Sequence, residues 1–331
     1  MRPYAYRRPT TADEALSTVG SNERARYLGG GTNLLDLMKE DVERPDTIVE
    51  VSELDYRSVT ANDNGSYTIG GMLNNTDTAN HPAIRQHYPL LTMTMLAAAT
   101  EQIRNMATNA GNLLQRTRCP YFFETSMPCN KREPGSGCGA RNGFNALHAI
   151  FGWSDACVAT NPSDMNVALA AIGATVIVRQ PGGGERRIPF GDFHRLPGDT
   201  PERDNTLEAG ELITAIELDP PRFARHYYYA KVRERNSYAF ALVSVAAGLE
   251  LRDDGIIASA GLAMGGVAHK PWKLTAAEEY LRGKAPGPDV FEAAAERAMA
   301  DAMPLEENEY KVEMGRRTIV RALTQAFERT A

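Results

Sequence analysis

The sequence lacks any apolar run as long as the ~18 residues of a membrane-spanning helix, so we expect no membrane insertion. Internal repeats and low-complexity segments are also absent. Acidic residues outnumber basic ones by 42 to 36, and the net charge of -6 predicts no nucleic-acid partner. We expect no signal peptide, because a polar segment and not an apolar one follows Arg7 and Arg8.

Common catalytic and nucleotide-binding motifs are missing as well. The six histidines occur singly and have no serine or cysteine partner in a recognisable motif, so a hydrolytic triad is not predicted. Most of them are expected at the surface or as satisfied core residues. The glycine-rich segments contain neither Gly-Lys-Ser/Thr nor Gly-x-Gly-x-x-Gly, which argues against a P-loop and a dinucleotide fingerprint.

Cysteine is scarce, yet all four cysteines lie close together in the sequence. They are Cys119, Cys129, Cys138 and Cys157, separated by nine, eight and eighteen residues. Disulfides suit small secreted chains, and structural zinc favours two close Cys-x2-4-Cys pairs. An iron-sulfur cluster accepts four cysteines from an open loop, and this loop is rich in proline and glycine. The spacing alone places an iron-sulfur cluster moderately ahead of zinc.

Two glycine-containing loops have the composition of anion sites. A predicted strand at 26–28 leads into Gly29-Gly30-Gly31-Thr32-Asn33, and a helical stripe follows from Leu34. Backbone N–H groups and a helix start can bind phosphate there, although a tight turn explains such a run equally well. The second loop, 104–112, suits a second phosphate or a ribose, with a plain connection as the alternative.

The remaining pattern predicts an α+β chain. A capping box at Thr11 and Glu14 starts the first helix, and Pro220-Pro221 marks a boundary. Further strands are expected at 47–51, 67–70, 175–178, 227–232, 240–251 and 256–264, and helices at 76–86, 89–103, 289–302 and 309–329. Another helix is expected to start from a cap and first turn at 161–164 and to continue through Ile172. The last section is therefore predicted to be an antiparallel sheet backed by helices. Two anion-type loops and one redox cluster together indicate electron transfer through a bound nucleotide cofactor.

These residues resemble a known family. The Tyr27 to Leu34 run, the Arg-Asn-x-Ala-Thr-x-x-Gly-Asn loop that ends at Asn112, and Ser163-Asp164 are similar to the FAD-binding medium subunit of the xanthine oxidase and carbon monoxide dehydrogenase family. The likeness covers essentially the whole chain. The cysteine insert resembles the branch with an extra 4Fe-4S cluster, which includes bacterial periplasmic aldehyde oxidoreductase and 4-hydroxybenzoyl-CoA reductase. This resemblance raises iron-sulfur well above zinc.

The resemblance implies a two-part FAD-binding domain of the vanillyl-alcohol-oxidase type with a 4Fe-4S insert, plus a C-terminal antiparallel sheet and helix domain. The expected boundaries are 1–54 and 55–219 for the two FAD-binding parts, with the cysteine insert at 115–160, and 220–331 for the C-terminal domain. Cys119, Cys129, Cys138 and Cys157 would bind the cluster. No substrate-oxidising residue is expected in this chain.

The resemblance also assigns cofactor-binding positions. It places the FAD pyrophosphate on the two glycine loops, the sugar or adenosine half on Asp164, and the isoalloxazine beside Ile213 and Lys231. The chain departs from the family pattern at Asn109 and Ala110. The full set of expected FAD-binding residues is Arg26, Tyr27, Leu28, Gly29, Gly30, Gly31, Thr32, Asn33, Leu34, Thr108, Asn109, Gly111, Asn112, Ser163, Asp164, Ile213 and Lys231.

The implied assembly is a heterotrimeric aldehyde oxidoreductase. Its partners would be a large molybdenum-cofactor subunit and a small subunit with two 2Fe-2S clusters, from which electrons pass to FAD and on to an external acceptor. The complex would be periplasmic, exported on a partner's signal, or cytoplasmic. Two alternatives differ in class: a zinc-stabilised interaction module without flavin, and a self-sufficient flavoprotein oxidase, which would need its own substrate base beside the flavin.

Overall fold

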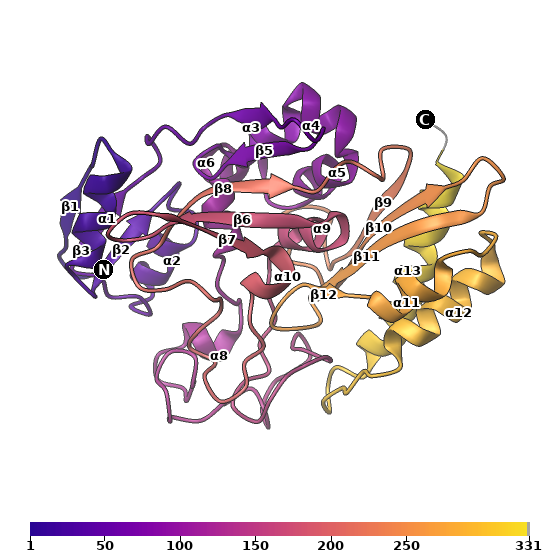
Figure 1. The fold of residues 1–331 in the computed structure, drawn as a ribbon. Coiled ribbons are helices and arrows are strands. Elements are labelled where there is room, and N and C mark those ends of the chain that lie inside the picture. Colours follow the sequence, from indigo (N-terminus) through magenta and orange to yellow (C-terminus); the bar gives the residue numbers. More distant parts are fainter. Residues whose placement is uncertain (330–331) are drawn as a thin grey trace.

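The computed structural model describes residues 1–329. The first strands of the chain form a small parallel sheet (Figure 1). The Thr11 hydroxyl accepts a hydrogen bond from the Glu14 N–H at 3.2 Å and so caps the first helix, as predicted. The sheet has the order β1-β3-β2, and its neighbouring strands are parallel. The elements are β1 (Ala5–Arg7), α1 (Ala12–Gly20), β2 (Ala25–Leu28), α2 (Leu34–Lys39) and β3 (Thr47–Glu50).

A five-stranded antiparallel sheet of order β4-β5-β8-β6-β7 forms the centre of the molecule. Its strands are β4 (Val59–Ala61), β5 (Tyr67–Gly70), β6 (Ala174–Arg179), β7 (Glu185–Pro189) and β8 (Leu212–Leu218). Strand β8, which the sequence analysis did not predict, is the middle strand, and most of its residues are buried. The helices are α3 (Asn75–Asn80), α4 (Pro82–His87), α5 (Pro89–Ala97), α6 (Glu101–Met106), α7 (Asn109–Leu113), α9 (Asp164–Ile172) and α10 (Phe190–Phe193).

Two of the predicted helices are wrong in length. The segments expected as helices at 76–86 and 89–103 form α3, α4, α5 and α6 instead. Pro82 starts α4, because proline fits the first turn of a helix but cannot continue the preceding one. Thr100 interrupts the second segment by capping α6 through its hydroxyl. The expected loop at 104–112 likewise contains the end of α6 and the short helix α7, capped by Thr108.

The C-terminal section is an antiparallel sheet of order β12-β11-β10-β9 with helices packed on it, which confirms the prediction. Its elements are β9 (His226–Val232), β10 (Val243–Leu251), β11 (Ile257–Gly265), β12 (Trp272–Lys273), α11 (Thr275–Leu281), α12 (Pro288–Met299) and α13 (Tyr310–Glu328). Helix α11 was not predicted. Helix α13 buries Ile319, Ala322, Leu323 and Ala326 at helical spacing, in the same core as Val245 of β10.

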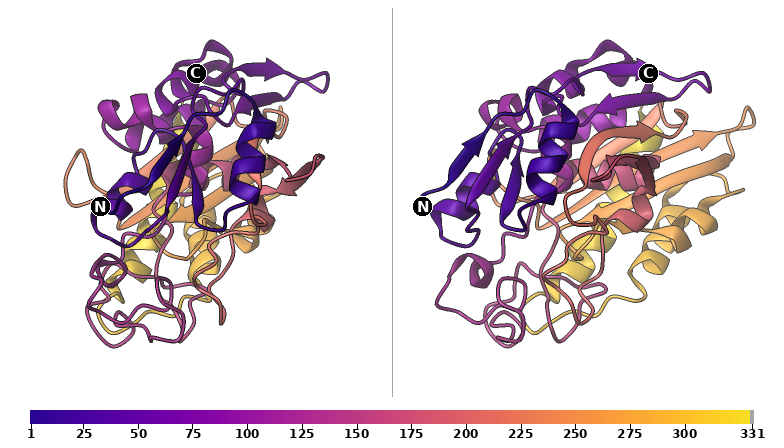
Figure 2. Two further views of the ribbon diagram at one scale, coloured as in Figure 1. Left: turned by 90° about the vertical axis from the view of Figure 1, so that its left-hand side faces the viewer. Right: turned by 60° about the vertical axis from the view of Figure 1, so that its left-hand side comes forward.

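The cysteine insert lies below the central sheet in the view of Figure 1, next to the chain segment that connects α12 to α13 (Figures 1 and 2). Apart from α8 (Pro120–Phe123), it consists of turns and bridges. The Met303 N–H donates to the Ile150 carbonyl at 2.7 Å, and the Trp153 indole donates to the Met303 carbonyl at 2.7 Å. The insert is therefore held against the C-terminal domain. No helix within residues 1–329 has the length and apolar character to cross a membrane.

Lys311 of α13 is a buried cation at this contact. Its ammonium donates to the His148 carbonyl at 3.0 Å and to the Gly266 carbonyl at 2.8 Å, with no carboxylate among its described partners. Desolvation lowers the pKa of Lys311 to about 7. The charged form therefore costs stability at neutral pH.

The lowered pKa of Lys311 predicts a pH dependence of the free energy of unfolding, and Lys311→Met should remove it. Between pH 7 and the ordinary lysine pKa of about 10.4, the unfolded chain binds the proton and the folded chain does not. The free energy of unfolding of the wild type should therefore rise by roughly 2 kcal/mol more than that of Lys311→Met between pH 7 and 9. Urea titrations at both pH values measure this difference, and equal pH slopes for the two proteins would contradict it.

Candidate functional site

The two predicted loops lie against each other. A Cβ atom added to Gly30 would lie 1.6 Å from the Met106 carbonyl oxygen, and one added to Gly29 would lie 2.5 Å from the Thr108 hydroxyl oxygen. Gly31 has a φ of +74°, in the left-handed region that favours glycine. Close packing against the second loop thus explains the glycines at positions 29 and 30, and the left-handed backbone explains Gly31.

A cavity of about 810 Å³ opens where these loops meet α9 and the β9–β10 connection. This volume is within the usual range for small-molecule sites. Its wall includes residues from the regions 1–54 and 55–219 and from the C-terminal section. The expected FAD-binding residues that line the cavity are Gly30, Gly31, Thr32, Asn33, Gly111, Asn112, Ser163, Asp164 and Lys231.

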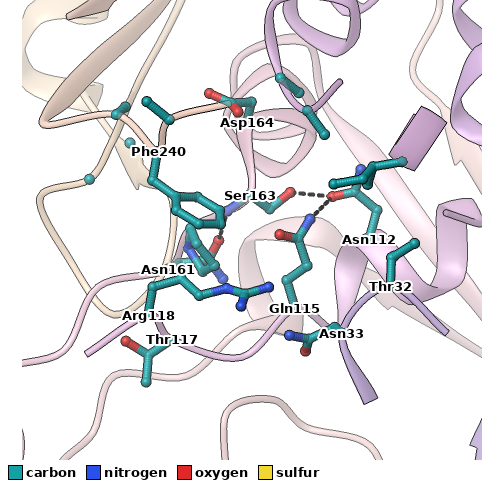
Figure 3. A pocket seen from close by; sticks show the side chains of 18 of the residues that line it. Thr32, Asn33, Asn112, Gln115, Thr117, Arg118, Asn161, Ser163, Asp164 and Phe240 are labelled. Atoms are coloured by element: carbon teal, nitrogen blue, oxygen red, sulfur yellow. Dashed lines mark hydrogen bonds between the residues drawn. The ribbon is translucent and has the colours of Figure 1, made fainter. Parts of the chain in front are cut away.

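Asn112 holds two walls of the cavity together (Figure 3). Its Oδ1 atom accepts hydrogen bonds from the Ser163 hydroxyl at 2.7 Å and from Gln115 Nε2 at 2.6 Å. Its Nδ2 atom donates to Asn75 Oδ1 at 2.7 Å. Asn112 therefore joins α7 to the start of α9, and its own polar atoms are already paired with protein groups.

Three donors on the cavity wall have no partner in the described part of the chain. They are Asn33 Nδ2, Arg104 Nε and Arg118 Nε, and each is a buried atom. Buried N–H groups are costly when they are left unpaired, so this wall is suited to a ligand with acceptor oxygens. Two of the three belong to guanidinium groups, which favour an anion. The donor set fits a diphosphate.

Arg118 projects into the cavity beneath Phe240 (Figure 3). Its guanidinium carbon lies 5.1 Å from the centre of the Phe240 ring and 5.5 Å from that of Phe123. One of its terminal nitrogens donates to Asp36 Oδ2 at 2.7 Å. The two rings and the carboxylate fix the position of this cation.

Asp164 and Lys231 form a buried ion pair at 2.8 Å on the cavity wall. Burial raises the pKa of the Asp164 carboxyl, while the Lys231 ammonium and the Tyr229 hydroxyl, which donates to it, oppose the rise. The sequence analysis placed these two residues at opposite ends of the flavin. In the structure the two side chains lie side by side on one stretch of the cavity wall, and their assignment to different parts of FAD stays a prediction.

The other expected FAD-binding residues do not line the cavity. These are Arg26, Tyr27, Leu28, Gly29, Leu34, Thr108, Asn109 and Ile213. Asn109 is buried and donates to the Gly70 carbonyl at 3.1 Å and to the Thr78 hydroxyl at 2.8 Å, so it stabilises the fold. Ile213 lies in the core of the central sheet, and one terminal nitrogen of Arg26 donates to the Glu23 and Ala25 carbonyls.

The four cysteines are free and line one small cavity inside the insert. The Asn130 N–H donates to the Gly137 carbonyl at 2.7 Å and brings Cys129 opposite Cys138. Burial raises the pKa of Cys119 to about 12 and that of Cys157 to about 11. Within residues 1–329, no three His, Cys, Asp or Glu side chains are placed to hold a single metal ion.

A network of buried charges joins the segment around the cysteine cavity to residues outside the insert. The Lys131 ammonium contacts Asp204 Oδ1 at 2.6 Å and His269 Nε2 at 2.6 Å, and Arg116 contacts Asp204 Oδ2 at 2.9 Å. Burial alone would raise the pKa of Asp204, but the Lys131 and Arg116 cations hold it well below its usual range. Lys131, which also lines the cavity, is thereby fixed in place.

Three histidines are buried, and one of them contacts a cysteine. Burial lowers the pKa of His148, His194 and His269 to about 4, so each is neutral at pH 7. His148 Nε2 lies 3.1 Å from Cys119 Sγ. Most histidines were expected to be surface or satisfied core residues, and His148 is an exception, because its Nδ1 has no partner among the described residues.

Comparison with known proteins identifies the family. The family described as FAD binding domain in molybdopterin dehydrogenase matches residues 2–221. This chain belongs to that family. The CO dehydrogenase flavoprotein C-terminal domain matches residues 227–330, so the two regions together account for nearly the whole chain. The chain is thus an FAD-binding subunit of an oxidoreductase in the molybdenum hydroxylase family, and the expectation of a flavin-free zinc module is wrong.

Individual relatives of the molybdopterin dehydrogenase family agree with this assignment. The chain is 45% identical to the aldehyde oxidoreductase FAD-binding subunit PaoB of Escherichia coli, over 98% of this chain and 99% of that protein. It is 25% identical to the glyceraldehyde dehydrogenase medium chain of Sulfolobus acidocaldarius, over 99% and 98%. A carbon monoxide dehydrogenase structure from Hydrogenophaga pseudoflava has the same fold, with a TM-score of 0.77, 23% identity, and coverage of 100% and 99%.

Several cavity residues of this FAD-binding subunit were not predicted as ligands. They are Arg104, Gln115, Arg118, Asn161 and Phe240. Their positions follow from loops that meet only in the folded chain. A usable signal was nevertheless present, because Gln115 to Arg118 is a polar, cationic run that begins three residues after the second glycine loop ends at Asn112.

Proposed function

We propose that this chain binds FAD in the 810 Å³ cavity and is the electron-transfer subunit of a heterotrimeric molybdenum-containing aldehyde oxidoreductase. The observation that carries the proposal is the set of unpaired donors at Asn33, Arg104 and Arg118. The 45% identity to an aldehyde oxidoreductase FAD-binding subunit supports the same reaction. Bound FAD supplies electron acceptance and onward transfer to an external acceptor.

The protein's own residues would bind and orient the flavin. Asn33, Arg104 and Arg118 would donate hydrogen bonds to the diphosphate, and the Asp164–Lys231 pair would contact the cofactor outside the diphosphate. Phe240, which stacks over Arg118, would cover this part of the cavity. We assign no substrate-oxidising residue to this chain. Aldehyde oxidation would take place on a large molybdenum-cofactor subunit. A small subunit with two 2Fe-2S clusters would pass the electrons from that subunit to this chain.

Gly111→Val tests the flavin site at a position that lines the cavity. Apart from its chain neighbours and the backbone of α7, the only atom of residues 1–329 within 4 Å of an added Cβ is the Thr108 hydroxyl oxygen at 3.1 Å, which a small side-chain shift would have to accommodate. The valine methyl groups would occupy cofactor space, so we expect at least a tenfold loss of FAD from soluble protein. Gly111→Ala should lose less. The flavin-to-protein absorbance ratio measures both, and full flavin content in folded Gly111→Val would refute the site.

Co-expression with matching partners tests the role as an electron-transfer subunit. We expect a stable complex with a molybdenum-cofactor subunit and a 2Fe-2S subunit, in which aldehyde bleaches the flavin absorbance within turnover. The control is the full chain alone, loaded with FAD. If aldehyde reduces its flavin at a catalytic rate without partners, the self-sufficient oxidase is the correct function.

We further propose a 4Fe-4S cluster in the cysteine cavity. All four cysteines of the chain line this one cavity, and none forms a disulfide. Four thiolates are the usual ligand set of such a cluster, and iron would deprotonate thiols whose pKa burial has raised. The cluster would add a one-electron redox centre to the chain.

Metal and sulfide analysis tests this cluster. The anaerobically purified chain should contain about four iron and four sulfide per chain. Cys129→Ser should lose most of both while it keeps FAD, because Cys129 does not line the flavin cavity. Stoichiometric zinc without sulfide in the wild type would exclude the cluster and leave the flavin assignment intact.

A further inference from the structure

The flavin cavity and the cysteine cavity share a wall. Thr117 and Cys119 line both cavities, and the Cys119 N–H donates to the Thr117 hydroxyl at 3.3 Å. Arg118, between them in sequence, lines only the flavin cavity. Cys129, Cys138 and Cys157 line only the cysteine cavity. Cys119 is therefore the one cysteine ligand with direct access to the flavin side.

His148 lies at this shared wall and contacts the Cys119 sulfur. Its ring is buried, lines the flavin cavity, and places Nε2 3.1 Å from Cys119 Sγ. Its backbone is fixed, because the His148 carbonyl accepts from Asn308 Nδ2 at 3.2 Å and from Lys311 Nζ at 3.0 Å. The histidine is therefore held in position by groups that belong to α13 and to the segment before it.

The hydrogen-bonding capacity of the two groups shows that His148, and not Cys119, is the donor. A thiolate that is bound to iron carries no proton, so the hydrogen of a contact with His148 must come from the imidazole. Nδ1 has no partner among residues 1–329, and a proton there would be a buried, unpaired donor. The proton consequently belongs on Nε2, which donates to Cys119 Sγ.

We propose that His148 is a positioning residue that donates a hydrogen bond to the Cys119 sulfur at the shared wall and thereby raises the reduction potential of the cluster. The proposal rests on the proposed 4Fe-4S site. A hydrogen bond to a ligand sulfur stabilises the reduced cluster more than the oxidised one, because reduction adds negative charge to the sulfur. The effect acts on the ligand that faces the flavin.

Cys119 is the ligand whose sulfur contacts a side-chain donor, so a substitution of that donor can change the reduction potential of the cluster. Among the hydrogen bonds of the described residues, the Cys157 sulfur accepts only from the Ala159 backbone N–H, at 3.5 Å, whereas the donor to Cys119 is a side chain. A substitution at position 148 therefore removes one hydrogen bond to sulfur and leaves all four cysteines in place. His148 also contacts no carboxylate in the described chain that its loss would leave unpaired.

A redox titration of the full-length chain tests the proposal. The wild type, His148→Leu and His148→Gln would be purified anaerobically with FAD, and the cluster would be followed by electron paramagnetic resonance across a series of potentials. We expect His148→Leu to reduce the equilibrium constant for cluster reduction about tenfold, a shift of about 59 mV to lower potential for one electron. Glutamine keeps an N–H donor, so His148→Gln should restore at least part of the shift.

Controls separate this proposal from the one on which it rests. His226→Leu changes a histidine that lines neither cavity and should leave the cluster potential unchanged. A wild-type chain without iron and sulfide would refute the cluster itself. A His148→Leu chain with a full cluster at the wild-type potential would refute only the role of His148. Folded His148→Leu and His148→Gln proteins that both lose iron would also overturn it, since the residue would then retain the cluster and not tune it.

Discussion

Gly30→Ala is expected to prevent most of the chain from folding. The added Cβ would lie 1.6 Å from the Met106 carbonyl oxygen and 2.3 Å from its carbon, both of which are backbone atoms that cannot rotate away. Separating the two loops would also disturb Tyr27 of β2, which packs against the core that contains Ala110 and Leu113. We expect destabilisation of about 4 kcal/mol or more, which places the variant at the extreme of single substitutions.

Soluble yield and the midpoint of thermal unfolding measure this effect. Gly191→Ala is the matched control, because the position is exposed and, apart from the chain neighbours and the backbone of α10, no atom of residues 1–329 lies within 4 Å of an added Cβ there. This control should behave like the wild type. A soluble Gly30→Ala protein with a wild-type midpoint would contradict the loop packing. Loss of FAD in a Gly30 variant is therefore no evidence for a phosphate contact, because the collision arises from the fold alone.

Breaking the Asp164–Lys231 pair is expected to lower the free energy of unfolding by nearly as much as Gly30→Ala does. Lys231→Met would leave a buried carboxylate, and Asp164→Asn would leave an ammonium whose remaining described partner is the Ala97 carbonyl at 3.2 Å. Removal of one member of a buried ion pair typically costs about 3–5 kcal/mol, because the other charge stays buried without compensation. We expect a loss of this size for each single variant, measured by urea unfolding.

The double variant Asp164→Leu/Lys231→Met provides the control. Removing both charges together should cost much less than the sum of the single losses, since no isolated charge remains. Additive losses would show that the two residues stabilise the fold independently. The single variants should in addition bind less FAD, because both residues line the cavity.

Local sequence chemistry was sufficient for many individual elements. Thr11 and Ser163 cap the predicted helices, and the sequence located β9, β10 and β11 of the C-terminal sheet but not β12. The helix boundaries failed at Pro82 and Thr100, where a single residue interrupts an apolar stripe that periodicity alone reads as continuous. The middle strand β8 was missed although Leu212 to Leu218 is a mostly apolar run, because the segment was considered only as a position beside the cofactor.

The candidate site was predicted from the two glycine loops and the family resemblance, and only part of its residues were placed correctly. The glycine loop, Asn112, Ser163 and Asp164 do line the cavity. Asn109 and Ile213 do not, because their side chains face the core of the central sheet. Sequence spacing identifies which segment approaches a ligand, but it does not show which side chains of that segment turn toward it.

By itself, the sequence determined the cysteine content of one short segment, the two glycine loops and the α+β character of the chain, because these follow from residue type and local periodicity. The tertiary structure alone decided that Gly30 meets Met106, that Lys231 pairs with Asp164, and that His148 reaches Cys119. Each of these contacts joins residues far apart in the chain. Their geometry depends on how the separate sheets and the insert pack, which no local pattern encodes.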